Sequence, residues 1–261
     1  MILLLYLWVF LFGLIIGSFL NCLIWRLYKN ESMWNRSYCP QCRHQIAWYD
    51  NIPVLSYLIL RGKCRYCHKT ISCQYPIVEF LVGVLFLMVF MKNSIALPNI
   101  YDWDWEFWLL NIRDWYIVAV MTVIFIYDLR WFLILDRVTL PACLILFLIN
   151  LFLGFSWQNL LISGIIGGSF FLVQFIISRG KWIGGGDIRL GLLIGLALAW
   201  PDSILAIFLA YIIGSVVGIG LILTKKKGMK SEIPLGTFLS VATVITLFFG
   251  KFILDWYLNF L

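Results

Sequence analysis

Long uninterrupted runs of apolar residues constrain this chain more than any other feature. The runs are roughly 18 to 22 residues long, the length of helix that crosses about 30 Å of hydrocarbon. Of the 261 residues, 62% are apolar and 13% are charged, whereas soluble domains average about 25% charged residues. This composition excludes a soluble enzyme. We predict an all-α polytopic membrane protein that lies in a lipid bilayer.

Eight runs are long enough to be transmembrane helices. They cover residues 2–24, 76–91, 108–128, 138–155, 159–178, 182–200, 203–224 and 235–258. The first run has no basic segment before it, and Arg26 and Lys29 follow it directly. We therefore interpret it as a permanent anchor with its N-terminus outside, and not as a cleaved signal. With eight spans, the C-terminus is also expected outside.

The positions of Lys and Arg test this topology independently, because cytoplasmic loops carry most of these residues. If alternate loops are cytoplasmic, they hold all but three of the 20 Lys and Arg residues. These are Arg26, Lys29, Arg36, Arg43, Arg61, Lys63, Arg65, Lys69, Arg130, Arg137, Arg179, Lys181, Arg189, Lys225, Lys226, Lys227 and Lys230. The net charge of +7 is thus explained by orientation in the membrane, and no nucleic-acid partner is expected.

Several predicted spans contain glycines four residues apart. The pairs are Gly13 with Gly17, Gly164 with Gly168, Gly191 with Gly195, and Gly214 with Gly218. Small residues at this spacing allow two helices to approach closely. An alternative explanation is that glycine is simply common in membrane helices.

The polar segment 25–75 separates the first helix, 1–24, from a predicted seven-helix membrane domain, 76–261. It contains C-P-Q-C at Cys39 to Cys42 and C-R-Y-C at Cys64 to Cys67. Four thiolates in two such pairs can complete a tetrahedral zinc site, and the spacing is typical of a zinc ribbon. We predict a small cytoplasmic zinc-ribbon-like loop that depends on the metal for much of its folding free energy.

Other roles are open to these side chains. A C-x-x-C pair can also exchange disulfides, although one pair would suffice and no thioredoxin-like βαβ pattern surrounds either. His44 and His68 each stand beside a pair and could replace a cysteine ligand, or lie outside the metal's ligands. The remaining cysteines, Cys22, Cys73 and Cys143, are interpreted as buried small apolar residues.

Two aspartates at the ends of apolar runs are the candidate catalytic residues. Asp128 follows a long run in Y-D-L-R, and Asp187 follows three glycines in G-G-G-D-I-R-L. A carboxylate at membrane depth is costly and is functional by default. The glycines permit unwound backbone, which survives in a membrane only where it is buried or lines a wet cavity. If the two carboxylates meet, one can activate water while the other, protonated, polarises a carbonyl group.

Less specific roles are also possible for these carboxylates. Asp128 could pair with Arg130 or Arg179, and Asp187 could cap the helix that follows it. A third carboxylate, Asp136, could support the site or pair with the neighbouring Arg137.

In this order along the chain, the motifs resemble those of the bacterial type IV prepilin leader peptidases, which are bifunctional aspartic peptidases and N-methyltransferases. The similar segments are G-S-F-L-N at 17–21, the two cysteine pairs, the stretch 53–79, Y-D-L-R-W-F-L-I-L-D at 127–136 and G-G-G-D-I-R-L at 184–190. The resemblance implies that Asp128 and Asp187 are the catalytic pair of a G-x-G-D-type membrane aspartic peptidase.

The resemblance also implies the substrate and the second activity. A prepilin or pseudopilin precursor would be cut after a glycine at the cytoplasmic face of the bacterial cell membrane, in support of pilus, type II secretion or competence pseudopilus assembly. The new N-terminal residue would then be methylated from S-adenosylmethionine.

The chain departs from the family pattern at four positions. Leu135 stands where proline is usual, Arg189 replaces a usual lysine, Cys22 follows the opening asparagine, and Tyr28 occupies a position where proline is common. None of these positions is one of the two aspartates or the paired cysteines.

Two other classes of protein could also carry these features. A transporter or channel would use the membrane carboxylates to move ions, with the cysteine loop as a metal sensor. An assembly scaffold would need no chemistry at all, and the triglycine–aspartate segment argues against it.

Overall fold

The structure is a computed structural model that describes residues 2–96, 104–224 and 233–260. Within these ranges the chain is helical and has no β-strand, only two isolated antiparallel bridges in the loop after the first helix. The all-α prediction is confirmed. Four of the lysines predicted in the cytoplasm, Lys225, Lys226, Lys227 and Lys230, lie outside the described residues.

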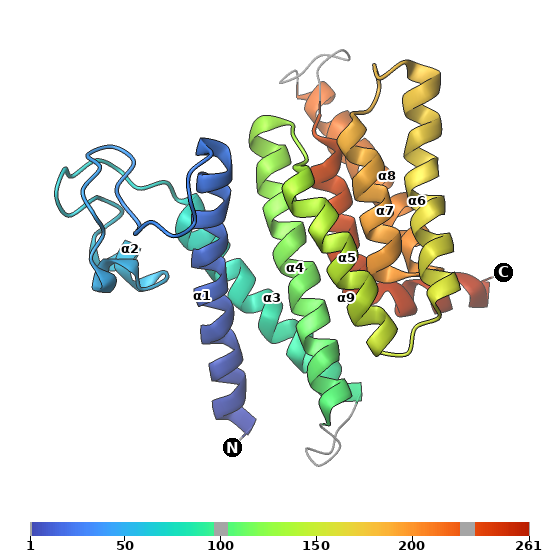
Figure 1. Cartoon of the computed structure of the whole chain (residues 1–261), viewed down its shortest axis with the longest axis horizontal. Coiled ribbons are helices and arrows are strands. Elements are labelled where there is room, and N and C mark those ends of the chain that lie inside the picture. Colours follow the sequence, from blue (N-terminus) through green and yellow to red (C-terminus); the bar gives the residue numbers. More distant parts are fainter. Residues whose placement is uncertain (1, 97–103, 225–232, 261) are drawn as a thin grey trace. The chain divides into compact units, whose positions relative to one another are not determined.

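The chain divides into two compact units, Met1–Ile100 and Tyr101–Leu261. In the first unit, the long helices α1 (Ile2–Lys29) and α3 (Gln74–Ala96) pack against each other (Figure 1). The loop between them contains a short 3₁₀ helix at Trp48–Asn51 and the one-turn helix α2 (Leu55–Ile59). The helix after the cysteine loop therefore packs with the first helix. The division into a first helix at 1–24, a polar loop at 25–75 and a membrane domain at 76–261 remains a prediction about which segments carry which function.

The second unit is a bundle of helices that run alternately up and down (Figure 1). Its helices are α4 (Trp105–Trp131), α5 (Asp136–Phe152), α6 (Trp157–Ser178), α7 (Gly185–Leu198), α8 (Asp202–Leu223) and α9 (Leu235–Phe260). Helix α7 packs against α5, α6, α8 and α9. It is the most enclosed of these helices, because every residue from Gly191 to Leu198 except Leu192 is buried.

Each of the eight predicted spans coincides with a helix, and six of these helices are long and apolar enough to cross a membrane. The other two, α5 and α7, have 17 and 14 residues. Both helices are shorter than the roughly 20 residues that a full crossing of the membrane requires. Helix α7 can be short because its neighbours in the bundle, and not lipid, surround most of its length.

Close helix packing is confirmed for two of the four glycine pairs. A Cβ added at Gly13 or Gly17 would lie 2.8 or 2.7 Å from the α3 backbone. One added at Gly191 or Gly195 would lie 2.4 or 2.2 Å from backbone oxygens of α6. At the other two pairs the nearest atoms would lie 3.1 Å or more away, and they belong to side chains except at Gly168, where the Ile188 carbonyl oxygen is nearest at 3.6 Å. The first two pairs therefore set how closely α1 approaches α3 and α6 approaches α7.

Side chains of neighbouring helices hold the C-terminal end of α7. Asn150 of α5 donates to the Leu196 carbonyl at 2.7 Å, and Arg113 of α4 donates to the Ala197 carbonyl at 2.6 Å. The last carbonyl groups of a helix have no partners within it. Buried side chains satisfy them here, so the position of α7 along its axis is fixed within the bundle.

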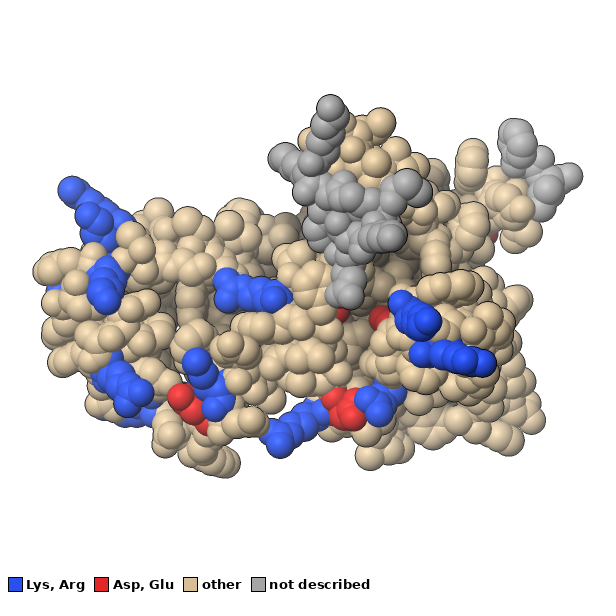
Figure 2. All heavy atoms as spheres, turned by 90° about the horizontal axis from the view of Figure 1, so that it is seen from above, with Lys and Arg blue, Asp and Glu red and all other residues tan. Residues whose placement is uncertain are grey.

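Charge and apolar surface are distributed as expected for a membrane protein. Figure 2 shows a face on which Lys and Arg are widespread while Asp and Glu are few.

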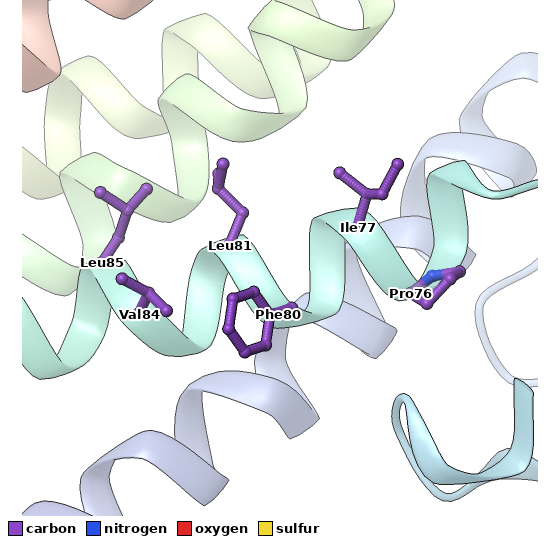
Figure 3. Close-up of a pocket in the computed structure, with 6 residues that line it drawn as sticks. All are labelled: Pro76, Ile77, Phe80, Leu81, Val84 and Leu85. Carbon is purple, nitrogen blue, oxygen red and sulfur yellow. The ribbon is translucent and has the colours of Figure 1, made fainter. Parts of the chain in front are cut away.

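In the first unit, α3 carries an apolar hollow lined by Pro76, Ile77, Phe80, Leu81, Val84 and Leu85 (Figure 3). The hollow contains no charged side chain, and an apolar surface of this kind suits acyl chains or another apolar helix.

The α6–α7 contact predicts a specific loss of stability. In Gly195→Ala, the new methyl group would overlap the Ser163 carbonyl, and such overpacking costs about 1–3 kcal/mol. We expect a lower unfolding temperature in detergent micelles. Gly220→Ala in α8 is the control, because nothing lies within 4 Å of its added Cβ. Equal unfolding temperatures for the two variants would contradict this packing.

Candidate active site and metal centre

Asp128 lies in the last turn of α4 and is 5% exposed. Its Oδ2 accepts a hydrogen bond from the backbone N–H of Thr237 at 2.7 Å and lies 3.2 Å from the Thr237 hydroxyl. Thr237 belongs to the first turn of α9, where backbone N–H groups are free to bind an anion. The sequence offered Arg130 or Arg179 as partners for Asp128, but the structure stabilises the carboxylate with a helix N-terminus.

Asp187 lies in the first turn of α7 and is 7% exposed. Its Oδ2 accepts from the backbone N–H of Gly184 at 2.9 Å, so it caps its own helix. The capping role proposed as an alternative is therefore present. A cap needs only one lone pair of the carboxylate, which leaves the other oxygen available for chemistry.

The triglycine does not have the backbone conformation that the sequence suggested. Gly184 is extended, Gly185 and Gly186 begin the helix, and none of the three has a positive φ. The unwound stretch precedes them, between the end of α6 and Gly184. Glycine is required at 186 for another reason, because an added Cβ would lie 2.8 Å from the Ile134 Cβ.

The Ile134 side chain lies between the segments that carry the surroundings of the two aspartates. This side chain meets Gly186 beside Asp187, and its Cδ1 would lie 3.0 Å from a Cβ added at Gly236. The same added Cβ would lie 2.9 Å from Asp128 Oδ2. Ile134 thus links the immediate surroundings of the two aspartates. The structure thus brings together two aspartates that are 59 residues apart in the sequence.

Asp136 has a partner that the sequence analysis did not foresee. Its Oδ1 pairs with the guanidinium group of Arg189 in α7, and both side chains are about half exposed. The suggested pairing with Arg137 is therefore not the ion pair observed. An exposed pair of this kind contributes little to stability, so Asp136 lies at the rim and is not a third buried carboxylate.

Two residues near the aspartates were missed by sequence reasoning. Thr237 donates to Asp128, and Gly236 allows that carboxylate to approach the start of α9. The available signal was P-L-G-T at 234–237, at the start of the last apolar run. Nothing in the sequence tied it to an aspartate 109 residues earlier.

The four paired cysteines converge in the loop of the first unit. The Sγ atoms of Cys39, Cys42, Cys64 and Cys67 all lie within 4.8 Å of one another, and those of Cys39 and Cys67 are 3.9 Å apart. Four sulfurs at 2.3 Å from a tetrahedral zinc ion would be about 3.8 Å apart. The donor set and its spacing therefore fit zinc.

The two cysteine pairs are structural repeats of each other. In the first, the Cys39 N–H donates to the carbonyl of residue 44 at 2.9 Å, and in the second the Cys64 N–H donates to that of residue 69 at 2.9 Å. One antiparallel bridge closes each turn, Tyr38 with Gln45 and Lys63 with Thr70. This equivalence at an offset of 25 residues is typical of the two halves of a zinc ribbon.

The surroundings of the cluster act in opposite directions on two of its thiols. At Cys42, the hydrogen bond from the backbone N–H of His44 is outweighed by desolvation and by the neighbouring Cys39 and Cys67 thiols, which raise the pKa to about 11. The backbone N–H of Cys67 lowers the pKa of the Cys64 thiol to about 7. His44 stacks on Tyr66, with ring centroids 3.5 Å apart. It therefore lies outside the metal-ligating group, as does His68. Of the other cysteines, which were all predicted to be buried, Cys143 is buried, Cys22 is only partly buried and Cys73 is exposed.

Comparison with known proteins gives the family. Residues 11–93 match the bacterial peptidase A24 N-terminal domain, and residues 115–219 match the type IV leader peptidase family. A prepilin leader peptidase/N-methyltransferase of Aeromonas hydrophila is 34% identical over 97% of this chain and 94% of its own length. The chain belongs to the type IV leader peptidase family.

Two further relatives carry the same name. The protein of Vibrio cholerae is 32% identical over 77% of this chain and 81% of its own length. That of Myxococcus xanthus is 31% identical over 85% of this chain and 65% of its own length. No solved structure matches the chain. Membership confirms the resemblance seen in the motifs and makes this chain a multi-pass membrane enzyme of the leader peptidase class.

Two departures from the family pattern fit this structure without strain. Leu135 precedes α5 with φ −86° and ψ 125°, a conformation close to that of proline. Arg189 forms the ion pair with Asp136, which a lysine could also form. Neither departure alters the surroundings of Asp128 or Asp187.

The contacts of Ile134 predict that two glycines are required near the aspartates and one is not. In Gly186→Ala and Gly236→Ala the new methyl group would displace Ile134, and at 236 also the Asp128 carboxylate. We expect leader-peptide cleavage to slow by about 10²-fold, as for a misplacement of catalytic groups by 1 Å. Gly185→Ala is the control, since its added Cβ meets open space. Cleavage that is equally fast in all three variants would contradict this geometry.

Proposed function

We propose that this chain is a prepilin peptidase that removes the basic leader of type IV prepilin-like precursors by cutting after a glycine. The observation that carries the proposal is the convergence of the buried Asp128 and Asp187 at the helix ends around Ile134. Family membership supports it, because relatives named prepilin leader peptidases align with nearly the whole chain.

In the proposed mechanism the two carboxyl groups share one proton. The ionised aspartate takes a proton from water, whose oxygen attacks the scissile carbonyl carbon. The protonated aspartate donates a hydrogen bond to the carbonyl oxygen as negative charge develops there. The carbon–nitrogen bond of the resulting tetrahedral intermediate then breaks as the leaving amine takes the proton that the first aspartate had removed from water.

The hydrogen bonds observed would preserve this arrangement during the reaction. Thr237 donates to Asp128, and the backbone N–H of Gly184 donates to Asp187. Each carboxyl group is thus held by the backbone at a helix start through its Oδ2 atom, and the other oxygen would be the one to meet water or substrate. The leader peptide would reach them at the helix ends.

The orientation of the enzyme follows from the charge distribution. We propose that it lies in the bacterial cytoplasmic membrane with both termini outside, and that the aspartates and the cysteine loop face the cytoplasm. A precursor with a basic leader and an apolar helix would insert the helix into the bilayer and leave the scissile glycine at the level of the aspartates. The assembly served would be a pilus, a type II secretion system or a competence pseudopilus.

We further propose that the enzyme methylates the new N-terminal residue with S-adenosylmethionine. The name that the relatives share supports this activity. The apolar hollow on α3 has no polar side chain to hold the amino-acid or ribose groups of the donor (Figure 3). We therefore assign no residue to the methyl donor.

The cysteine cluster is proposed to bind a structural zinc ion through Cys39, Cys42, Cys64 and Cys67. The short loop around it has little apolar core, since large apolar side chains such as Trp34 and Trp48 are exposed. Metal binding would therefore supply folding free energy that the loop cannot obtain from burial.

Substitution of the aspartates tests the peptidase. Asp128→Asn and Asp187→Asn keep the shape and one hydrogen-bond acceptor, but they remove the acid–base chemistry, so cleavage should fall by at least about 10²–10⁴-fold. Asp136→Asn, at the exposed rim, is the matched control and should cleave normally. The measurement is mass spectrometry of a prepilin co-expressed with each variant. Full processing by either buried-aspartate variant would refute the proposal.

Metal content tests the cysteine cluster. Cys64→Ser should reduce bound zinc from about one ion per chain to much less, because three thiolates and an alcohol bind zinc poorly. Cys73→Ser, which changes an exposed cysteine outside the cluster, should keep its zinc. Elemental analysis of the purified proteins reads the metal, and an unfolding scan should show lower stability for Cys64→Ser alone. Some proteolysis should persist in that variant, since the aspartates lie in the other unit.

A further inference from the structure

Helix α2 exposes a cluster of large apolar side chains within a loop expected in water. Leu58 and Ile59 are 63% and 72% exposed, and Ile52, Leu55 and Trp48 are exposed as well. We call these five residues the α2 patch. A contiguous apolar patch on a water-soluble surface is unfavourable and usually marks a contact with a membrane or another protein.

A strained turn leads into this helix. Val54 has φ 60° and ψ −49°, and the Leu55 N–H donates to the Pro53 carbonyl at 2.6 Å. This is a γ-turn of the rare hand, which is particularly unfavourable for a β-branched residue. Such a conformation persists only where the surrounding structure imposes it.

The group that imposes it is a carboxylate of a membrane helix. Glu79 of α3, which is 7% exposed, accepts a hydrogen bond from the Val54 N–H at 2.7 Å. The Glu79 backbone packs against Gly17 of α1, where an added Cβ would lie 2.7 Å from the Glu79 Cα. The start of α2 is therefore tied to a defined height along α1.

That height lies well within the membrane-spanning part of α1. Gly17 precedes residue 24, where the predicted span ends, by seven residues, which corresponds to about 10 Å along the helix axis. Figure 1 shows the same arrangement, with α2 lying alongside α1 and not beyond its end. An exposed apolar helix at this height would meet acyl chains.

Five backbone N–H groups of this segment have the partners that such a position requires. In hydrocarbon, every N–H and C=O group must find a partner within the protein. The N–H groups of Val54, Leu55, Ser56, Leu58 and Leu60 all have acceptors, and the Ser56 hydroxyl donates to the Tyr49 carbonyl at 2.9 Å. The polar groups are thus turned inward while the apolar side chains point out.

We propose that residues 52–60 are a re-entrant segment that inserts the α2 patch, except Trp48, among the acyl chains of the leaflet at the Lys29 end of α1. Glu79 fixes its depth. Arg61 and Lys63, both exposed, follow the segment and would meet anionic phosphate groups of the lipids, while Trp48 suits the interfacial region. The cysteine loop would then be anchored to the bilayer by its own helix. The inference does not rest on the proposed peptidase activity.

Photo-crosslinking tests the insertion directly. The full chain, with p-benzoylphenylalanine in place of Leu58, is irradiated in liposomes of phosphatidylethanolamine and phosphatidylglycerol, and the adducts are identified by peptide mass spectrometry. Leu3 of α1, which is 79% exposed, is the lipid-facing control, and the exposed Gln45 of the first cysteine turn is the aqueous control. We expect lipid adducts at 58 at a level comparable to position 3 and about tenfold above position 45.

The other outcomes would overturn the insertion. Adducts from position 58 to peptides of residues 101–261, or to a second copy of the chain, would show that protein covers the patch. A lipid yield as low as that of position 45 would show that the patch lies in water.

The role of Glu79 is tested in the same assay. Glu79→Leu removes the acceptor for the Val54 N–H and should lower the lipid adduct at 58 several-fold, because the strained turn can relax. Glu79→Gln keeps an acceptor oxygen and should retain the adduct. Equal yields in both variants would show that Glu79 does not set the depth, and a loss in both would show that its charge, and not the hydrogen bond, is required.

Discussion

A buried carboxylate without a cation needs hydrogen-bond donors, and this requirement organises the second unit. Asp128 finds its donors at the first turn of α9, and Asp187 finds one at the first turn of its own helix α7. The end of α4 must therefore meet the starts of two other helices. Glycines at 186 and 236 make that meeting possible by leaving room for Ile134.

The packing of the bundle holds α7, and with it Asp187, in a fixed position. Asn150 and Arg113 hold its far end through backbone carbonyl groups, and the glycines of α6 and α7 bring the two backbones into contact. A short helix enclosed by longer ones cannot slide or tilt without breaking these contacts. The rigidity required of a catalytic group is thus supplied by packing along the rest of α7, up to 10 residues away from Asp187.

Much of this could be predicted from the sequence, because the signals are local. Apolar run lengths predicted the helices, and the spacing of Cys39, Cys42, Cys64 and Cys67 predicted a cluster that the structure brings together. What could not be predicted depends on the tertiary arrangement. The donor to Asp128 comes from 109 residues away, the partner of Asp136 is Arg189, and Gly186 of the triglycine serves close approach instead of unwinding.

The most direct test of the account is the pH dependence of kcat/KM for prepilin cleavage by the purified enzyme, with the unfolding temperature measured at each pH. Two coupled carboxyl groups that act as one acid and one base should give a bell-shaped profile, with the rate falling on both sides of a maximum while the enzyme stays folded. A rate that rises to a plateau and remains there at high pH would contradict a shared proton between Asp128 and Asp187.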